Sequence, residues 1–184
     1  MKTVNEIRHI LLICIIISFF IGCKKDPDKG KYYGTASATF NGKAWQSGKV
    51  RCIITKQCSY GKLGFQFQVY NQYNELREEM IFFKIPSAVG TYIINPLNLN
   101  DPLCKDTIPI GSYHTLQSDG DVALDSYNAI LSSNNYFKID NYNERTKELR
   151  GSFAVTFKIF SRQDPNSPDT IRVSNGSFNT KILE

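Results

Sequence analysis

Apolar and polar residues alternate along most of the chain after Tyr32, and this period of two constrains the fold more than any other feature of the sequence. Successive side chains of a β-strand point to opposite faces of a sheet, so alternation predicts strands with one buried face. The clearest segment places apolar residues or glycine at every second position, at Leu149, Gly151, Phe153, Val155, Phe157 and Ile159. No stretch of eleven or more residues has helical periodicity, and only residues 143–149 could form a turn of helix in place of a strand connection.

Shorter alternating segments occur throughout the same part of the chain. Their apolar sets, each expected to face one way, are Ala36, Ala38 and Phe40; Phe65, Phe67 and Val69; Ile81, Phe83 and Ile85; and Phe137 and Ile139. Asn41-Gly42, directly after the first set, is typical of a two-residue hairpin turn. The pattern predicts a single all-β antiparallel domain over residues 33–184, a β-sandwich or flattened barrel, with little or no helix outside the signal peptide.

The C-terminal alternation changes phase within one expected strand. Ile171 and Val173 have odd numbers, whereas Phe178 and Ile182 have even numbers. A strand that buries both pairs needs one extra residue between them, and Asn175-Gly176 is suited to a bulge with positive φ.

The N-terminus contains the most apolar stretch of the sequence. Residues 10–22 read ILLICIIISFFIG, thirteen residues without a charge, and they follow Lys2, Arg8 and His9. A membrane-spanning helix needs about 20 apolar residues, so this run is too short to span a bilayer. A basic start followed by an apolar run of this length is typical of a secretory signal peptide.

The residues that end this run resemble the lipobox of bacterial lipoproteins, in which a small residue precedes a cysteine. Here Gly22 precedes Cys23, while Phe20 and Ile21 stand where the usual pattern has Leu and Ala or Ser; Bacteroidota-type lipoproteins also carry bulky residues there. The resemblance implies cleavage before Cys23 and attachment of lipid to its sulfur, with further acylation (such as palmitate) of the new N-terminus. The alternative is an ordinary secretory signal with Cys23 as an incidental thiol.

The lipobox resemblance implies an organisation for the whole chain. Residues 1–22 would be a lipoprotein signal peptide, residues 23–32 a lipidated flexible tether, and residues 33–184 the β domain. Several acyl chains attach a protein stably to a membrane, so the membrane is an expected partner through Cys23. Lys24 beside the cysteine indicates an outer-membrane lipoprotein, with the periplasmic and surface faces both open.

A second resemblance lies within the domain. Phe40-Asn41-Gly42-Lys43-Ala44-Trp45 is similar to the opening motif of a family of Bacteroidota cell-envelope lipoproteins that has no assigned function. The family's two C-terminal strand motifs correspond to residues 149–153 and 173–178. These motifs describe hairpins and core residues, so the resemblance implies a β-rich envelope lipoprotein and carries over no catalytic residue.

Three cysteines remain besides Cys23 and Cys14 of the signal. Cys52 alternates with Val50 and Ile54, which favours a buried free thiol. Cys58 and Cys104 lie in turn-rich segments, and we expect these two to form a disulfide, although three pairings are possible. The sequence predicts neither a metal site nor another cofactor, because it has no CxxC motif.

The charge of the chain argues against a nucleic-acid partner. Removal of residues 1–22 takes away Lys2, Arg8 and Glu6, so 22 basic and 17 acidic residues become 20 and 16, a net charge of +4. Half of this excess lies in the tether, and the remaining basic residues are scattered. A nucleic-acid-binding face would show a basic stripe or patch.

Two motifs are candidates for a catalytic or an ion-binding site. His114 is the one histidine after residue 22, and a hydrolase would need it as a base oriented by Asp119 or Asp121; no Gly-x-Ser-x-Gly motif accompanies it. Residues 118–121 together with Asp125 hold three carboxylates, but a hairpin turn explains Asp-Gly more simply than a calcium loop.

The functional prediction is a membrane-anchored, non-catalytic binding or structural accessory of the cell envelope. One alternative is a carbohydrate-binding accessory, since ten tyrosines, Trp45 and many asparagines suit sugars. Aromatic residues also stabilise β-sheets in proteins that bind no sugar. A hydrolase that uses His114 is the other alternative. A glycan or an envelope protein is the expected partner, and the long irregular segment 95–109 is the expected site.

Overall fold

Strands and their connections, without any helix, make up the residues that the structure, a computed structural model, describes: 34–54, 61–97, 108–117 and 122–183. The strands are β1 (Thr35–Phe40), β2 (Lys43–Ser47), β3 (Lys49–Ile54), β4 (Leu63–Tyr70), β5 (Leu76–Ile85), β6 (Gly90–Ile93), β7 (Ile110–Leu116), β8 (Ala123–Ala129), β9 (Tyr136–Asn143), β10 (Glu148–Ser161) and β11 (Thr170–Leu183). The predicted all-β fold is confirmed. The described residues contain no helix long and apolar enough to cross a membrane.

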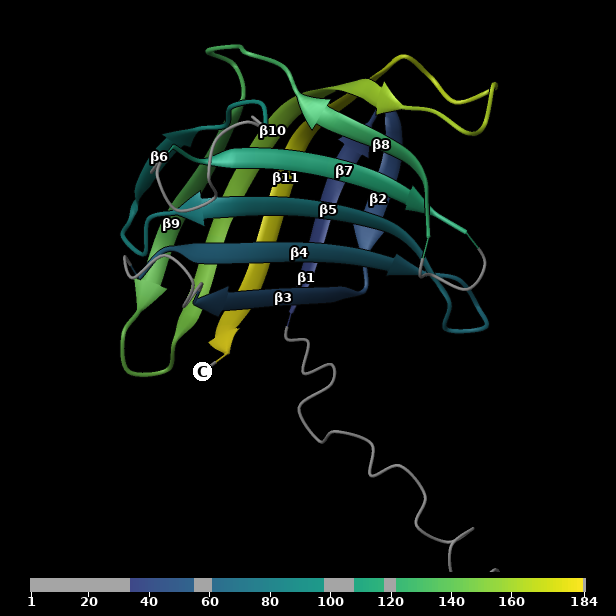
Figure 1. The fold of residues 1–184 in the computed structure, drawn as a ribbon. Helices are drawn as coiled ribbons and strands as arrows, with labels where there is room; N and C mark the ends of the chain where they lie inside the picture. The colour runs from purple at the N-terminus through teal and green to yellow at the C-terminus, as the bar shows by residue number, and fades with distance from the viewer. Residues whose placement is uncertain (1–33, 55–60, 98–107, 118–121, 184) are drawn as a thin grey trace, which may run out of the picture. The chain divides into compact units, whose positions relative to one another are not determined.

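The strands form two layers, and the long strands β10 and β11 connect one layer to the other. One layer has the order β2-β1-β11-β10-β9-β6, and the other has the order β3-β4-β5-β7-β8. Figure 1 shows β3, β4, β5 and β7 crossing in front of β1, β9, β10 and β11. The layers join where β10 pairs with β8, at Phe157↔Ala129, and where β11 pairs with β3, at Ile182↔Cys52. This arrangement is a sandwich closed into a flattened barrel.

One junction departs from the antiparallel prediction. The end of β11 pairs with β3 in parallel, whereas the other pairings between these named strands are antiparallel. The parallel direction arises because β11 reaches the edge of the second layer only with its last residues, after pairing with β1 and β10 along most of its length.

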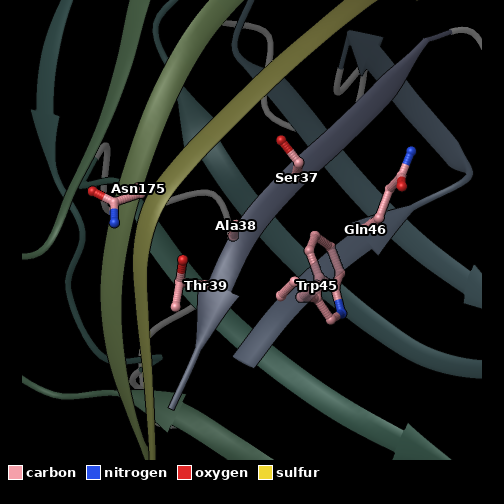
Figure 2. Close-up of a pocket in the computed structure, with 7 residues that line it drawn as sticks. Ser37, Ala38, Thr39, Trp45, Gln46 and Asn175 are labelled. Carbon is pink, nitrogen blue, oxygen red and sulfur yellow. The ribbon is translucent and has the colours of Figure 1, made fainter. Parts of the chain in front are cut away.

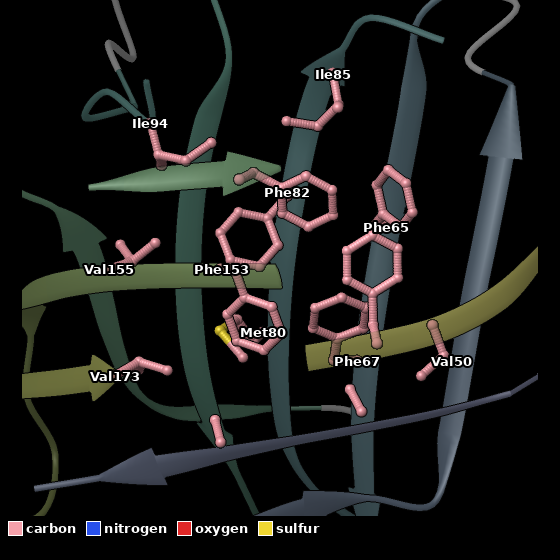
Figure 3. Close-up of a cluster of buried hydrophobic side chains, with 14 of the residues drawn as sticks. Val50, Phe65, Phe67, Met80, Phe82, Ile85, Ile94, Phe153, Val155 and Val173 are labelled. Carbon is pink, nitrogen blue, oxygen red and sulfur yellow. The ribbon is translucent and has the colours of Figure 1, made fainter. Parts of the chain in front are cut away.

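Aromatic side chains fill the space between the layers. Figure 3 shows Phe65, Phe67, Phe82 and Phe153 packed together among aliphatic residues. The ring centroids of Phe67 and Phe153 are 5.2 Å apart, and those of Phe82 and Phe137 are 5.0 Å apart. Large aromatic side chains bury much apolar area each, so this cluster supplies most of the driving force that holds the layers together.

The predicted alternation of β10 and the predicted bulge of β11 are both confirmed. The register of β10 with β11 passes from Phe153↔Gly176 to Val155↔Val173, which leaves one extra residue on β11. Asn175 takes the positive φ, 52°, and its side chain is exposed. Gly176 is required for another reason: a Cβ there would lie 2.5 Å from the Phe153 ring. The bulge therefore keeps both halves of the strand facing the core.

The prediction that Ile81, Phe83 and Ile85 of β5 share one face is wrong. Met80 and Phe82 are fully buried, while Ile81 and Phe83 are half-buried on the opposite, outer face. Ile85 returns to the core because β5 has an extra residue near Lys84, whose φ is 61°. A bulge centred on lysine has no glycine or asparagine to mark it in the sequence.

The other predicted turns agree with the structure. Asn41 and Gly42 have φ of 45° and 81° and connect β1 to β2, as expected for a two-residue hairpin. Residues 144–147 form a turn between β9 and β10, so the strand connection weighed for 143–149 is present in place of a helix. Phe65, Phe67 and the apolar face of β9 are buried as predicted, while Val69 is half-buried.

Candidate functional site

His114 lies on the outer face of the second layer, in β7. Its Nδ1 is 3.0 Å from the Ser126 hydroxyl, and its Nε2 is 3.1 Å from the Ser112 hydroxyl. Ser126 is the cross-strand partner of His114 on β8, and Ser112 precedes it by two residues on β7. Strand register and alternation therefore place both hydroxyls against the ring.

This environment favours a neutral, immobile imidazole. Burial lowers the pKa of His114 from its ordinary value of 6.5. A catalytic triad places a carboxylate on the second ring nitrogen, which stabilises the imidazolium formed during reaction. Here a serine takes that place. Among the residues described, Glu79 is the cross-strand neighbour of His114, but its Oε1 accepts a hydrogen bond of 2.6 Å from Gln68.

Asp125, grouped with residues 118–121 in the sequence, has a structural role at the end of the barrel. Its carboxylate is 1% exposed and accepts hydrogen bonds from the backbone N–H of Gln163 and Asp164 and from the hydroxyls of Thr115 and Ser167. Burial raises the pKa of Asp125, but these hydrogen bonds outweigh burial and bring it below 3.8. Asp125 thus secures the β10–β11 connection.

No cation site is evident in the described part of the chain. Those residues contain no group of three or more His, Cys, Asp or Glu side chains that could hold a metal ion. Asp119 and Asp121 lie outside them. The predicted hairpin is present on either side of that gap, because β7 pairs with β8 and Gln117 N–H donates to the Val122 carbonyl.

A shallow groove of about 500 Å³ lies on the outer face of the β1–β2 hairpin. Its lining residues are Ser37, Ala38, Thr39, Ala44, Trp45, Gln46 and Asn175. Figure 2 shows Ser37 and Thr39 on β1, Gln46 on β2, and Asn175 at the bulge of β11. Polar and apolar groups contribute about equally to this lining; the polar ones are hydroxyls and amides, and none of the lining side chains is charged. The groove thus suits a polar, uncharged ligand.

Trp45, which the sequence suggested as a sugar-stacking residue, largely contacts other side chains of the protein. Its indole N–H donates to Glu78 at 2.8 Å, and its ring stacks on Phe40 with centroids 4.8 Å apart and planes 5° apart. Tyr113 lies edge-on to Phe40, and burial, followed by the charge and hydrogen bond of Glu78, raises the pKa of Tyr113. These contacts stabilise the junction of the layers.

The cysteine predictions are tested at one position. Cys52 is fully buried and forms no disulfide, as expected, and burial raises the pKa of its thiol. Such a thiol is inert, because the reactive form is the thiolate. Cys23, Cys58 and Cys104 lie outside the described residues, as does most of the segment 95–109. Its two ends meet, since Asn95 N–H donates to the Pro109 carbonyl at 2.9 Å.

The sequence did not predict that the outward-facing polar residues of the second layer form one continuous surface. Alternation identified which residues point away from the core in most strands, but not which of them are neighbours across strands. No family model, curated protein or solved structure matches the chain.

Proposed function

We propose that the chain is a lipid-anchored protein of the cell envelope, located at the outer membrane, whose β domain is a non-catalytic binding accessory. The anchor is supported by Gly22-Cys23 at the end of a thirteen-residue apolar run. The binding role is supported by one observation above all, the uncharged groove on the β1–β2 hairpin. Rigid β scaffolds commonly hold ligands on such surface features.

A carbohydrate is the ligand class that this groove favours. Ser37, Thr39, Gln46 and Asn175 offer both hydrogen-bond donors and acceptors, which pair with the hydroxyl groups of a neutral sugar. The absence of charged side chains from the lining disfavours ions and phosphorylated ligands. His114 has no part in this role, because it lies on the other layer with both ring nitrogens engaged.

The anchor is tested by metabolic labelling of cells with an alkyne fatty acid. We expect label on the wild-type protein and on Cys14→Ser, and none on Cys23→Ser, which should also leave the membrane fraction. Cys14→Ser is the matched control because it removes a cysteine from the apolar run itself. Label retained by Cys23→Ser would contradict lipidation at this residue.

The groove is tested by calorimetry against a panel of neutral oligosaccharides. The double variant Thr39→Val with Gln46→Ala should weaken binding roughly ten-fold or more, since each lost hydrogen bond leaves a ligand group unpaired. His114→Ala should bind as the wild type does. Loss of binding with His114→Ala and retention in the groove variant would point to the other layer.

A further inference from the structure

The outer face of the second layer carries a row of residues that extends across its five strands and onto the end of β10 that joins it. The row consists of Arg51, Gln66, Ile81, Ser112, Asn128 and Lys158, and each residue is the cross-strand partner of the next. Each alternates along its strand with buried core residues, so the row faces away from the core. At about 4.8 Å per strand, the row is about 24 Å long. Figure 1 shows this layer nearest the viewer.

The chemistry of the row changes along its length. Arg51 stands at one end and the exposed Lys158 at the other, and between them come an amide, the apolar Ile81, a hydroxyl and a second amide. A parallel row beside it contains Gln68, Glu79 and His114. There the single carboxylate is already paired with Gln68, and the histidine with two serines. The Glu79 carboxylate keeps its negative charge, because glutamine is neutral; the charged side chains of the first row, Arg51 and Lys158, are both positive.

Two adjacent groups in the row have no hydrogen-bond partner among the described residues. The Nε of Arg51 and the Oε1 of Gln66 are buried atoms without a partner, and the two residues face each other across β3 and β4. Buried polar groups in native proteins are nearly always satisfied. Both atoms are shielded from solvent, so a ligand on this face meets the partly exposed remainder of the two side chains rather than these two atoms.

An apolar patch adjoins this pair. A Cβ on Gly64 would lie 3.1 Å from Cδ1 of Phe83 and 3.5 Å from Cγ1 of Ile53, so the Phe83 ring lies over β4 at the glycine. Phe83 and Ile81 are the residues of β5 that the sequence pattern placed on one face with Ile85. Their outward position provides a half-buried aromatic surface beside Arg51 and Gln66.

We propose that this row, with Phe83, binds an acidic oligosaccharide, such as a chain of uronic acids, that lies across the strands. The guanidinium of Arg51 pairs with a sugar carboxylate, and Lys158 attracts a second one. Gln66, Ser112 and Asn128 hydrogen-bond to ring hydroxyls, and Phe83 contacts an apolar sugar face. This site goes beyond the proposed groove, since it is on the other layer and selects for negative charge.

The test uses galacturonate oligomers and the full-length wild-type protein in detergent, followed by calorimetry at fixed salt. Arg51→Gln should weaken binding roughly ten-fold or more, because charge-assisted hydrogen bonds are about twice as strong as neutral ones. Arg150→Gln is the matched control: Arg150 is an exposed arginine on β10, at a position paired with β9 and β11 of the other layer, and it should leave binding unchanged.

Gln66→Leu is a second variant, in which an uncharged side chain of similar size to glutamine replaces the amide, and it should also weaken binding. Circular dichroism and thermal melts establish that each variant is folded. Three results would overturn the proposal: no saturable binding by the wild type, equal weakening by Arg150→Gln, or equal affinity for neutral glucose oligomers. The groove variant, Thr39→Val with Gln46→Ala, should bind galacturonate normally. A failure of the proposed groove can therefore be told apart from a failure of this row.

Discussion

At the scale of single residues, several polar groups at the edge of the core have partners that explain them. Asp125 secures the β10–β11 connection, and Trp45 and Glu78 join the hairpin to the second layer. His114 is held by Ser112 and Ser126. The sequence showed these residue types but not their partners, because most of the partners lie on a different strand or loop.

The lowered pKa of His114 makes stability depend on pH. The unfolded state takes up a proton near the ordinary pKa of 6.5, whereas the folded state resists protonation. The contribution of His114 is therefore fully present above 6.5 and is lost as the pH falls toward the lower folded-state pKa. We expect the free energy of unfolding to decrease across this window in the wild type.

His114→Gln should remove this part of the pH dependence, since glutamine does not titrate and can still hydrogen-bond to serine. Urea unfolding at a series of pH values between about 7.5 and 5 measures the effect. Ser126→Ala keeps the histidine and serves as the control. Parallel stability profiles for the wild type and His114→Gln would contradict the prediction.

At the scale of strands, two bulges decide which side chains reach the core. The bulge of β11 was predictable, because the apolar residues change phase next to Asn175-Gly176. The bulge of β5 was not, because Lys84 adopts a positive φ without a residue type that favours it. The sequence pattern consequently placed Ile85 on the same face as Ile81 and Phe83, whereas the bulge turns Ile85 to the core.

The β11 bulge should respond to substitution according to backbone conformation. Asn175→Gly should be nearly neutral, because glycine adopts a φ of 52° without strain. Asn175→Val should cost about 1–2 kcal/mol, since a β-branched side chain is strained at positive φ. Chemical denaturation of the two variants measures the difference.

Deletion of Asn175 is the stronger form of this test. Without the extra residue, either Ile171 and Val173 or Phe178 and Ile182 must leave the core, and we expect loss of the cooperative fold. A deletion variant with wild-type stability would show that the bulge is dispensable.

At the scale of the whole domain, the closure of the barrel depends on a short seam. Among the residues that the structure describes, Ile182 and Leu183 are the ones of β11 that pair with β3, at Cys52 and Ile53. Ile182 is 4% exposed, so the seam also contributes to the core. The opposite junction is formed by the C-terminal half of β10 with β8.

Ile182→Ala should open this seam locally. Loss of a buried isoleucine side chain costs about 2–5 kcal/mol, and the amides of Cys52 and Ile53 should exchange with solvent faster than those of β10. Lys181→Ala, at an exposed position beside it, should change neither quantity. Unaltered exchange in Ile182→Ala would show that the seam does not hold the layers together.

For the candidate sites, too, the sequence indicates which residues face outward, and only the tertiary structure shows which of them are neighbours. Alternation in the sequence indicated that Gln66 faces away from the core, but its inclusion in one row with Arg51 and Ser112 required the register of β3, β4, β5 and β7. The groove likewise combines β1 and β2 with Asn175, which is more than a hundred residues further along the chain.

By itself, the sequence determined the β class, the Asn41-Gly42 hairpin, the buried face of most strands and the bulge at Asn175. All of these follow from local backbone preferences and from the alternation of side chains within one strand. Only the tertiary structure decided the outward position of Phe83, the parallel seam at Ile182 and the pairing of Arg51 with Gln66. Cross-strand register depends on contacts between distant segments, and no local pattern encodes which segments become neighbours.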